Sequence, residues 1–224
     1  MINWDPLLLT FKLAGFTTCL LLIIAIPLSY YLAYSRSRIK PILETLVSMP
    51  LVLPPTVLGF YLLVTFSTGH PIGRFFDDAL GIRLLFSFPG LVIGSIIYSL
   101  PFMVQPLQAG FAALPVSLKE ASYVLGKSSL TTMIRVLLPN MKPALLSGIV
   151  LAFAHTVGEF GVVLMIGGNI PNSTRVASIA IYDEVEALNY DAANTYSLIL
   201  FAITFSLLLL VYLFNGGYFK KILP

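Results

Sequence analysis

Five long apolar segments, separated by short polar stretches, most constrain how this chain of 224 residues can fold. A helix needs about 20 mostly apolar residues to cross the hydrocarbon core of a bilayer. The segments that meet this length are residues 13–34, 45–66, 88–108, 143–167 and 195–214. Only 10% of the residues are charged, whereas soluble domains carry roughly 25%. The sequence therefore predicts an all-α integral membrane protein with about five transmembrane helices.

The uncharged run at residues 84–118 leaves one alternative open. It is barely long enough for two helices and a turn, which would give six spans in place of five. The first span does not resemble a cleaved signal peptide, because its apolar stretch is too long and basic residues follow it. We expect residues 1–224 to form a single transmembrane domain, with its core at about 10–214 and a cytoplasmic loop at 110–142.

The distribution of basic residues predicts the orientation of the chain. With the amino terminus outside, the carboxyl terminus is cytoplasmic and nine lysines and arginines lie on the inner side. They are Arg36, Arg38, Lys40, Lys119, Lys127, Arg135, Lys142, Lys220 and Lys221. The outer loops then hold three, which are Arg74, Arg83 and Arg175. Cytoplasmic segments of membrane proteins are enriched in Lys and Arg, so this orientation is the favoured one.

The cytoplasmic loop contains a polar segment that favours a short helix. Ser117 and Glu120 fit a capping box, with Ser117 as the N-cap and Glu120 at the third helical position. Gly126 is placed to end the helix in a left-handed turn. This chemistry predicts a helix of about two turns at residues 118–125.

Two kinds of side chain would fit this helix to dock on a partner protein. Ala121 and Ser122 are small and permit close approach, and Leu118, Val124 and Leu125 could fill a socket. Any amphipathic connecting loop could be capped in this way, so the helix alone does not identify its role.

The spacing of the whole segment is more specific. Glu120-Ala121-Ser122 is followed by three residues, Gly126, nine residues, Val136, one residue and Leu138-Pro139. This pattern resembles the EAA loop of binding-protein-dependent ABC importer permeases of the type 1 fold. Ser122 departs from the second alanine that is usual there, and Val136 replaces an isoleucine. In that family the loop helix couples the permease to a cytoplasmic ATPase.

The resemblance implies a set of partners and a cellular location. Two permease copies, here expected as a homodimer, form the pathway in the bilayer. A cytoplasmic ABC ATPase dimer binds ATP and Mg, and an extracytoplasmic oxyanion-binding protein delivers the solute. The sequence has no P-loop pattern (GxxxxGK[ST]), so we expect no cofactor on this chain and no enzyme activity of its own. Nucleic acid is not an expected partner, and the expected location is the cytoplasmic membrane of a prokaryote.

Two further segments narrow the substrate. Residues 49–59 contain Pro54-Pro55, and Gly158-Glu159-Phe160-Gly161 precedes the segment 165–171. Together they look like those of the molybdate/tungstate permeases, with the sulfate/thiosulfate permeases as the alternative. These ions are tetrahedral dianions, and a pathway for them should lack strong anion traps that would stall release.

The second and fourth spans carry the candidate pathway or gate residues. Pro54 and Pro55, with Pro50 before them, remove backbone donors and should kink the second helix. His155 and Glu159 lie four residues apart, so they share one face of a continuous fourth helix and could pair. Since an unpaired Glu159 would repel a dianion, we expect it to bond a neighbouring group. Gly161 completes this candidate set.

Other functions remain open for the same residues. Ionisable groups inside a span are costly and commonly face a wet cavity, but they can also form a satisfied structural pair. A metal site has little support, because the other histidine, His70, lies in an outer loop. From a different class, the chain could be a membrane enzyme centred on His155 and Glu159, or a passive channel or scaffold.

Overall fold

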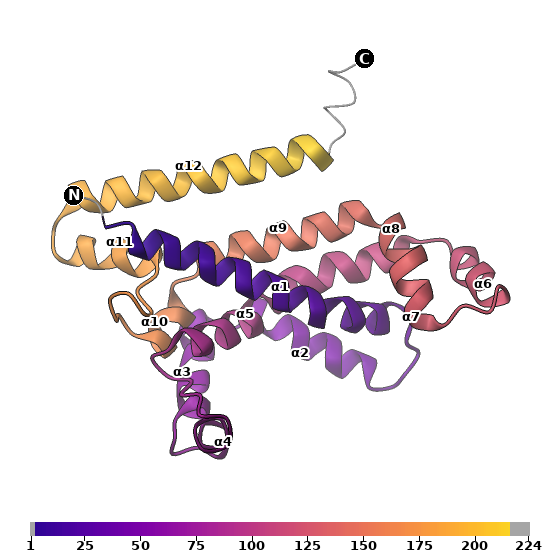
Figure 1. Ribbon diagram of the computed structural model, residues 1–224, viewed down its shortest axis with the longest axis horizontal. Coiled ribbons are helices and arrows are strands. Elements are labelled where there is room, and N and C mark those ends of the chain that lie inside the picture. Colours follow the sequence, from indigo (N-terminus) through magenta and orange to yellow (C-terminus); the bar gives the residue numbers. More distant parts are fainter. Residues whose placement is uncertain (1–2, 216–224) are drawn as a thin grey trace.

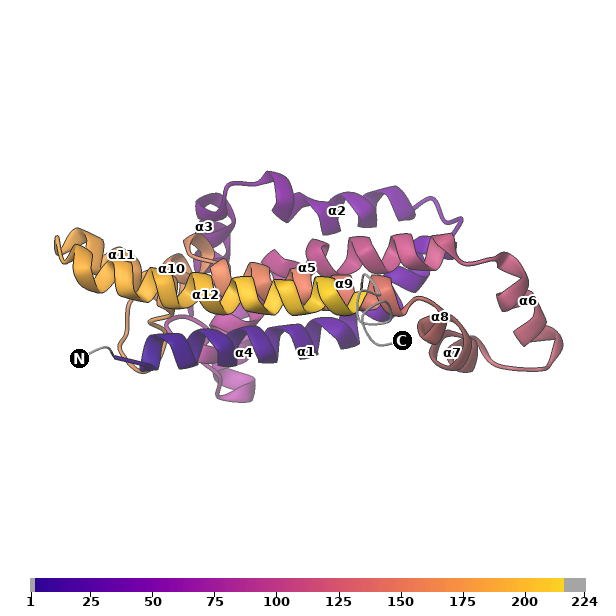
Figure 2. The ribbon, with the colours of Figure 1, turned by 90° about the horizontal axis from the view of Figure 1, so that it is seen from above.

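The computed structural model describes residues 3–215 as a bundle of helices. The helices α1 (Asp5–Tyr34), α5 (Phe88–Ala113), α9 (Lys142–Gly158) and α12 (Tyr190–Asn215) lie roughly along the long axis of the molecule (Figures 1 and 2). This described range contains no strand. The all-α membrane fold predicted from the sequence is therefore confirmed.

Three single helices are long and apolar enough to cross a membrane. They are Asp5–Tyr34, Phe88–Ala113 and Tyr190–Leu213. Two bent pairs raise the number of candidate spans in the described chain to 5. One pair joins α2 (Lys40–Val52) to α3 (Pro55–Phe66), and the other joins residues 129–140 to α9. The structure is thus compatible with five spans, although two of them are not straight helices.

The second predicted span is broken at its prolines. α2 and α3 meet at an angle of 113°, and the break lies at Leu53 and Pro54. Proline lacks an N–H and fits the first position of a helix, which is where Pro55 lies in α3. The expected bend is therefore found at Pro54 and Pro55. Pro50 lies inside α2, which continues past it.

The prediction of one continuous helix over residues 143–167 is wrong. α9 ends at Gly158, Glu159 has extended backbone, and α10 (Gly161–Gly167) starts a new helix. The carbonyl of Glu159 accepts a hydrogen bond from Ser178 Oγ at 2.6 Å, so this backbone group is satisfied outside any helix. A Cβ atom on Gly161 would lie 2.6 Å from Cβ of Pro55. The absence of a side chain thus lets α10 start directly against α3.

α5 forms the centre of the bundle and packs against α1, α9, α10 and α2. Two apolar clusters lie along it. The cluster toward the α6 end, here called the inner apolar cluster, includes Leu107 and Phe111. The cluster toward the α11 end, here called the outer apolar cluster, includes Leu91 and Ile166. α12 is different, because only 6% of the residues in its most apolar stretch are buried. Its surface is therefore available to lipid or to another chain.

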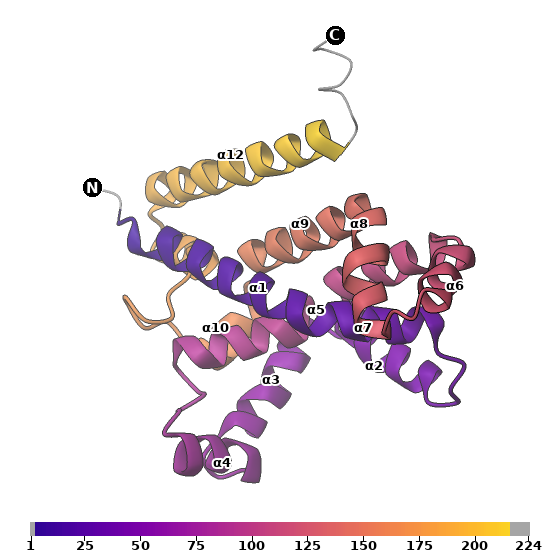
Figure 3. The ribbon, with the colours of Figure 1, turned by 45° about the vertical axis from the view of Figure 1, so that its right-hand side comes forward.

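The two ends of the bundle carry different short helices (Figures 1 and 2). One end holds the loop after α1, α6 (Val116–Val124), α7 (Ser129–Thr132), a π-helical turn (Met133–Leu137) and α8 (Leu138–Asn140). The other end holds α11 (Ala177–Glu186) and the start of α1. α3 leads sideways out of the bundle to α4 (Pro71–Leu80), as Figure 3 shows. Lys220 and Lys221, two of the basic residues used to predict orientation, lie outside the described residues.

Candidate functional site

The helix predicted in the polar loop is present as α6, but it starts differently from the prediction. It begins at Val116, with Pro115 as its N-cap residue and no side-chain capping bond. Ser117 is therefore the second helical residue, so the predicted capping box of Ser117 and Glu120 is wrong. The physical reason is Pro115, whose φ of −58° and ψ of 132° set the extended entry to the helix one residue earlier.

The end of α6 follows the prediction closely. Gly126 has a φ of +72°, in the left-handed region that glycine adopts without a Cβ clash. The Lys127 N–H donates to the Ser122 carbonyl at 3.1 Å, and the Gly126 N–H donates to the Tyr123 carbonyl at 2.9 Å. These two bonds are the Schellman pattern. Gly126 therefore terminates the helix and turns the chain back toward α7.

The two faces of α6 only partly match the predicted docking surface. Leu118 is half-buried and packs against the inner apolar cluster, so it does not project outward. Ser122 is buried and bonded to Thr132 Oγ1 at 2.8 Å, so it holds α6 to α7. Val124 is 88% exposed and Leu125 is 74% exposed. These two residues, here called the apolar tip, remain free with the exposed Ala121 and Glu120 beside them.

α6 is connected to α1 by a cluster of aromatic rings that the sequence did not reveal. Lys119 Nζ lies 4.2 Å from the ring centre of Tyr34 and 5.5 Å from that of Tyr30. The hydroxyl of Tyr123 lies 3.2 Å from that of Tyr30. This hydrogen bond, with a weaker contribution from Ser129, lowers the pKa of the Tyr123 phenol. In the sequence, Tyr30 and Tyr34 are four residues apart, and so are Lys119 and Tyr123. This spacing places each pair on one helix face, and it is the sequence signal that could have revealed the cluster.

The last two predicted loop residues lie in α8. Leu138 is half-buried and packs against the inner apolar cluster, whereas Pro139 is exposed. Leu138 thus anchors the return of the loop to the bundle.

The other candidate residues meet where the two helix breaks touch. A cavity of about 530 Å³ lies between α3, α5, α9 and α10. Pro55, His155, Glu159 and Gly161 line it, together with Thr56 and Tyr98, and Pro54 directly precedes α3. The structure therefore brings the predicted pathway residues together from two distant parts of the sequence. Broken helices are a recurrent way to build solute sites within membranes.

His155 and Glu159 each bond a serine of α5 instead of pairing with one another. Ser99 Oγ lies 2.9 Å from His155 Nδ1, and Ser95 Oγ donates to Glu159 Oε2 at 3.0 Å. The two groups could have paired on a continuous helix, but α9 ends at Gly158, and the Glu159 side chain bonds α5 instead. The expected bond from Glu159 to a neighbour is confirmed. Glu159 is 4% exposed, and its Oε1 has no hydrogen-bond partner in the described chain.

Aromatic rings complete the surroundings of His155. The ring of Phe102 is stacked on the imidazole at 3.8 Å between ring centres, and the ring of Tyr98 lies at 4.7 Å. Both come from α5. Ser95 and Ser99 are four residues apart, as are His155 and Glu159. This matching spacing is the sequence signal that could have identified the two serines as partners.

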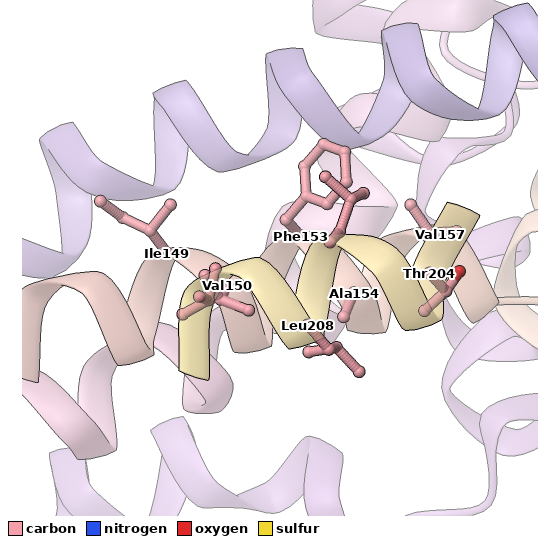
Figure 4. Close-up of a pocket in the computed structure, with 9 residues that line it drawn as sticks. Ile149, Val150, Phe153, Ala154, Val157, Thr204 and Leu208 are labelled. Atoms are coloured by element: carbon pink, nitrogen blue, oxygen red, sulfur yellow. The ribbon is translucent and has the colours of Figure 1, made fainter. Parts of the chain in front are cut away.

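A second cavity lies between α9 and α12 (Figure 4). Its volume is about 220 Å³, and Ile149, Phe153, Leu207 and Leu208 are among the residues that line it. Thr204 is its one polar lining residue. With no charged group and a wall turned toward the surface of the bundle, this cavity does not suit an ion.

Comparison with known proteins identifies the family. The family described as "binding-protein-dependent transport system inner membrane component" matches residues 25–222. The chain is 47% identical to the molybdenum transport system permease protein ModB of Azotobacter vinelandii, over 95% of this chain and 93% of that protein. It is 34% identical to the sulfate transport system permease protein CysT of Synechocystis, over 77% of this chain and 60% of that protein.

Solved structures show the same fold. A permease chain of a bacterial ABC transporter that imports the acidic polysaccharide alginate superposes with a TM-score of 0.75. The match covers 98% of this chain and 79% of that chain at 16% sequence identity. The chain therefore folds like an ABC importer permease.

Proposed function

Because the chain belongs to the family of binding-protein-dependent transport system inner membrane components, we propose that it imports molybdate or tungstate. It would act as the membrane subunit of an ATP-driven importer, as one transmembrane domain in a prokaryotic cytoplasmic membrane. ATP and Mg would bind the partner ATPase. Two copies would enclose the pathway, and an extracytoplasmic binding protein would supply the oxyanion. The amino terminus would be outside and the carboxyl terminus inside.

α6 is the observation that carries this proposal. Its apolar tip, Val124 and Leu125, is exposed at the end of the bundle that bears Arg36, Arg38 and Lys40. If that end is cytoplasmic, as its positive charge favours, the tip is surrounded by water and not by lipid. Exposed apolar side chains in water mark surfaces for a partner. An ATPase that accepts this tip would transmit its movement through α6.

The cluster of aromatic rings between α6 and α1 supports a path for that movement. Lys119 and Tyr123 contact the inner end of α1 through Tyr30 and Tyr34, and α1 packs along α5 and α9. A displacement of α6 would therefore reach the helices that border the cavity at His155. We assign this cavity to the pathway that alternately opens to the two sides.

The choice of molybdate follows the ModB relative. Sulfate is the second candidate, because the sulfate permease relative is also above 30% identity. Both ions are tetrahedral dianions, and the same cavity chemistry would serve either.

The test reconstitutes the permease with its ATPase in liposomes and adds binding protein loaded with molybdate, tungstate or sulfate. Stimulation of ATP hydrolysis by molybdate or tungstate is the expected result, with unloaded binding protein as the control. Stimulation by sulfate alone would contradict the assigned cargo. Equal hydrolysis with and without the permease would contradict the coupling role of α6.

A further inference from the structure

The hydrogen bonds around His155 determine which of its ring nitrogens carries a hydrogen. Thr156 Oγ1 donates its only hydrogen to the Ala152 carbonyl at 2.9 Å. It must therefore accept from Ser99 Oγ, which lies 3.0 Å away. Ser99 has then used its own hydrogen, so it accepts from His155 Nδ1 at 2.9 Å. The imidazole thus has its hydrogen on Nδ1.

Nε2 is consequently the ring position that can gain or lose a proton. It has no hydrogen-bond partner among residues 3–215. In the neutral ring Nε2 presents a lone pair, which repels an anion. With a proton added, the same atom becomes a donor on a positively charged ring. Histidine is the side chain whose charge changes most readily near neutral pH.

His155 is also the one basic side chain among those that line the cavity. The other titratable groups there are Tyr98 of α5 and Glu159, and α3 and α10 contribute none. Two other long helices pack against α9. On α1, Lys12 lies over the ring of Phe88. Among the described side chains of α12, the charged one is Asp191, in the first turn. A dianion in this cavity therefore has no fixed positive charge beside it.

A dianion without a compensating charge is costly in a site with apolar walls. Its arrival favours the charged form of a nearby imidazole, because opposite charges within about 4–6 Å stabilise each other. Resting on the proposed transport of an oxyanion, we infer that His155 is the group that binds the ion in the cavity, taking up one proton at Nε2 as the ion enters. The proton comes from bulk water on the side to which the cavity is open, and it leaves Nε2 when the ion departs.

This arrangement explains how the cavity attracts an anion without trapping it. An arginine or lysine would keep its charge in every state and hold the ion in each. The His155 charge exists only while the anion is present. Ser99, Phe102 and Tyr98 fix the ring, so only the proton on Nε2 needs to move.

The first test observes the two histidines directly. The permease chain alone is labelled with ¹⁵N-histidine and assembled with unlabelled ATPase in nanodiscs, and His70→Gln assigns the signals. Sodium molybdate is then compared with sodium chloride at equal ionic strength and constant pH. We expect Nε2 of His155 to become protonated with molybdate while Nδ1 stays protonated and His70 is unchanged.

Two outcomes would overturn the inference, and one would separate it from the cargo assignment. A His155 signal that does not respond to molybdate or sulfate contradicts it. A ring already doubly protonated without an oxyanion also contradicts it. A response to sulfate but not to molybdate supports the binding role of His155 and contradicts the proposed molybdate cargo.

The second test measures transport as a function of pH. In the wild-type complex transport should decline as pH rises through the histidine range of about 5–8, because protonation of Nε2 becomes less favourable. His155→Gln should lose this dependence, and His70→Gln, which changes the other histidine, should retain it. A His155→Gln profile identical to the wild-type profile would refute the role of Nε2.

Discussion

The apolar tip of α6 and the cavity at His155 depart from ordinary burial in opposite directions. At the tip, Val124 and Leu125 are exposed at a polar end of the molecule. At the cavity, Glu159 and its hydrogen-bond donor Ser95 are buried between membrane helices. Apolar groups in water and polar groups in a membrane interior both cost free energy. The difference fits the proposed roles, in which the tip contacts a partner and the cavity takes a polar solute.

The largest expected effect is on the turn that presents the tip. Gly126→Val places a β-branched side chain at a φ of +72°, which costs about 1–2 kcal/mol and misplaces the end of α6. Transport should fall roughly tenfold or more, as measured by molybdate uptake in liposomes. Gly81→Val is the matched control, because Gly81 has a φ of +64° and also has open space around it. Equal uptake by wild type and Gly126→Val would show that this turn is not needed.

The second prediction separates docking from folding on the same helix. Leu125→Asp changes a side chain that is 74% exposed, so stability should stay within about 0.5 kcal/mol of wild type. ATP hydrolysis should nevertheless lose its stimulation by binding protein, because an apolar socket would bury an unpaired carboxylate. Leu118→Ala should do the reverse and lower the free energy of unfolding by roughly 1–2 kcal/mol, since Leu118 is only half-buried. Normal stimulation in Leu125→Asp would exclude the tip as the docking surface.

The third prediction concerns the contact between the two helix breaks. Gly161→Ala adds a Cβ that would lie 2.6 Å from Cβ of Pro55. The crowding should destabilise the protein by about 1–3 kcal/mol, seen as a lower unfolding temperature in detergent, and it should distort the cavity. Gly15→Ala is the control, because a Cβ there meets nothing within 4 Å. Similar stability of the two variants would mean that α10 and α3 are not in close contact.

The smallest effect is expected for Ser122, a buried serine whose removal leaves its partner with another hydrogen bond. Ser122→Ala removes the bond to Thr132, but Thr132 still donates to the Ser128 carbonyl. The loss should be below about 1 kcal/mol. Ser95→Ala should cost more, roughly 1–3 kcal/mol, because Glu159 would lose its described donor. Chemical unfolding of both variants gives the comparison, and the opposite order would contradict the assigned hydrogen bonds.

Local chemistry explains which parts of the fold the sequence could predict. The left-handed turn at Gly126 and the bend at Pro54-Pro55 depend on the residues at those positions, and both were predicted correctly. The break at Glu159 was missed, because residues 143–167 are mostly apolar and contain no proline after Pro143 that would mark a break. Its cause is tertiary: Ser95 of α5 bonds one carboxyl oxygen of Glu159, and Ser178 of α11 bonds the Glu159 backbone carbonyl.

The candidate site shows the same limit. The residues predicted around His155 lie together at one cavity, and their role in a pathway stays a prediction. Their partners on α5 could not be identified without the helix packing. On α6, the length of the helix was predictable, whereas the inward direction of Leu118 and Ser122 depends on where α7 lies. The capping box failed because Pro115 acts one residue before Ser117.

The bond from Ser178 to the Glu159 carbonyl has a consequence for the outer end of the molecule. The same helix, α11, is also tied to α1, since the Ala177 N–H donates to Thr10 Oγ1 at 2.8 Å. α11 therefore cannot tilt or slide without pulling on the backbone at the break in the fourth span. A spectroscopic probe on an exposed position of α11, such as Val185, would thus report the state of the cavity from the α11 end of the bundle.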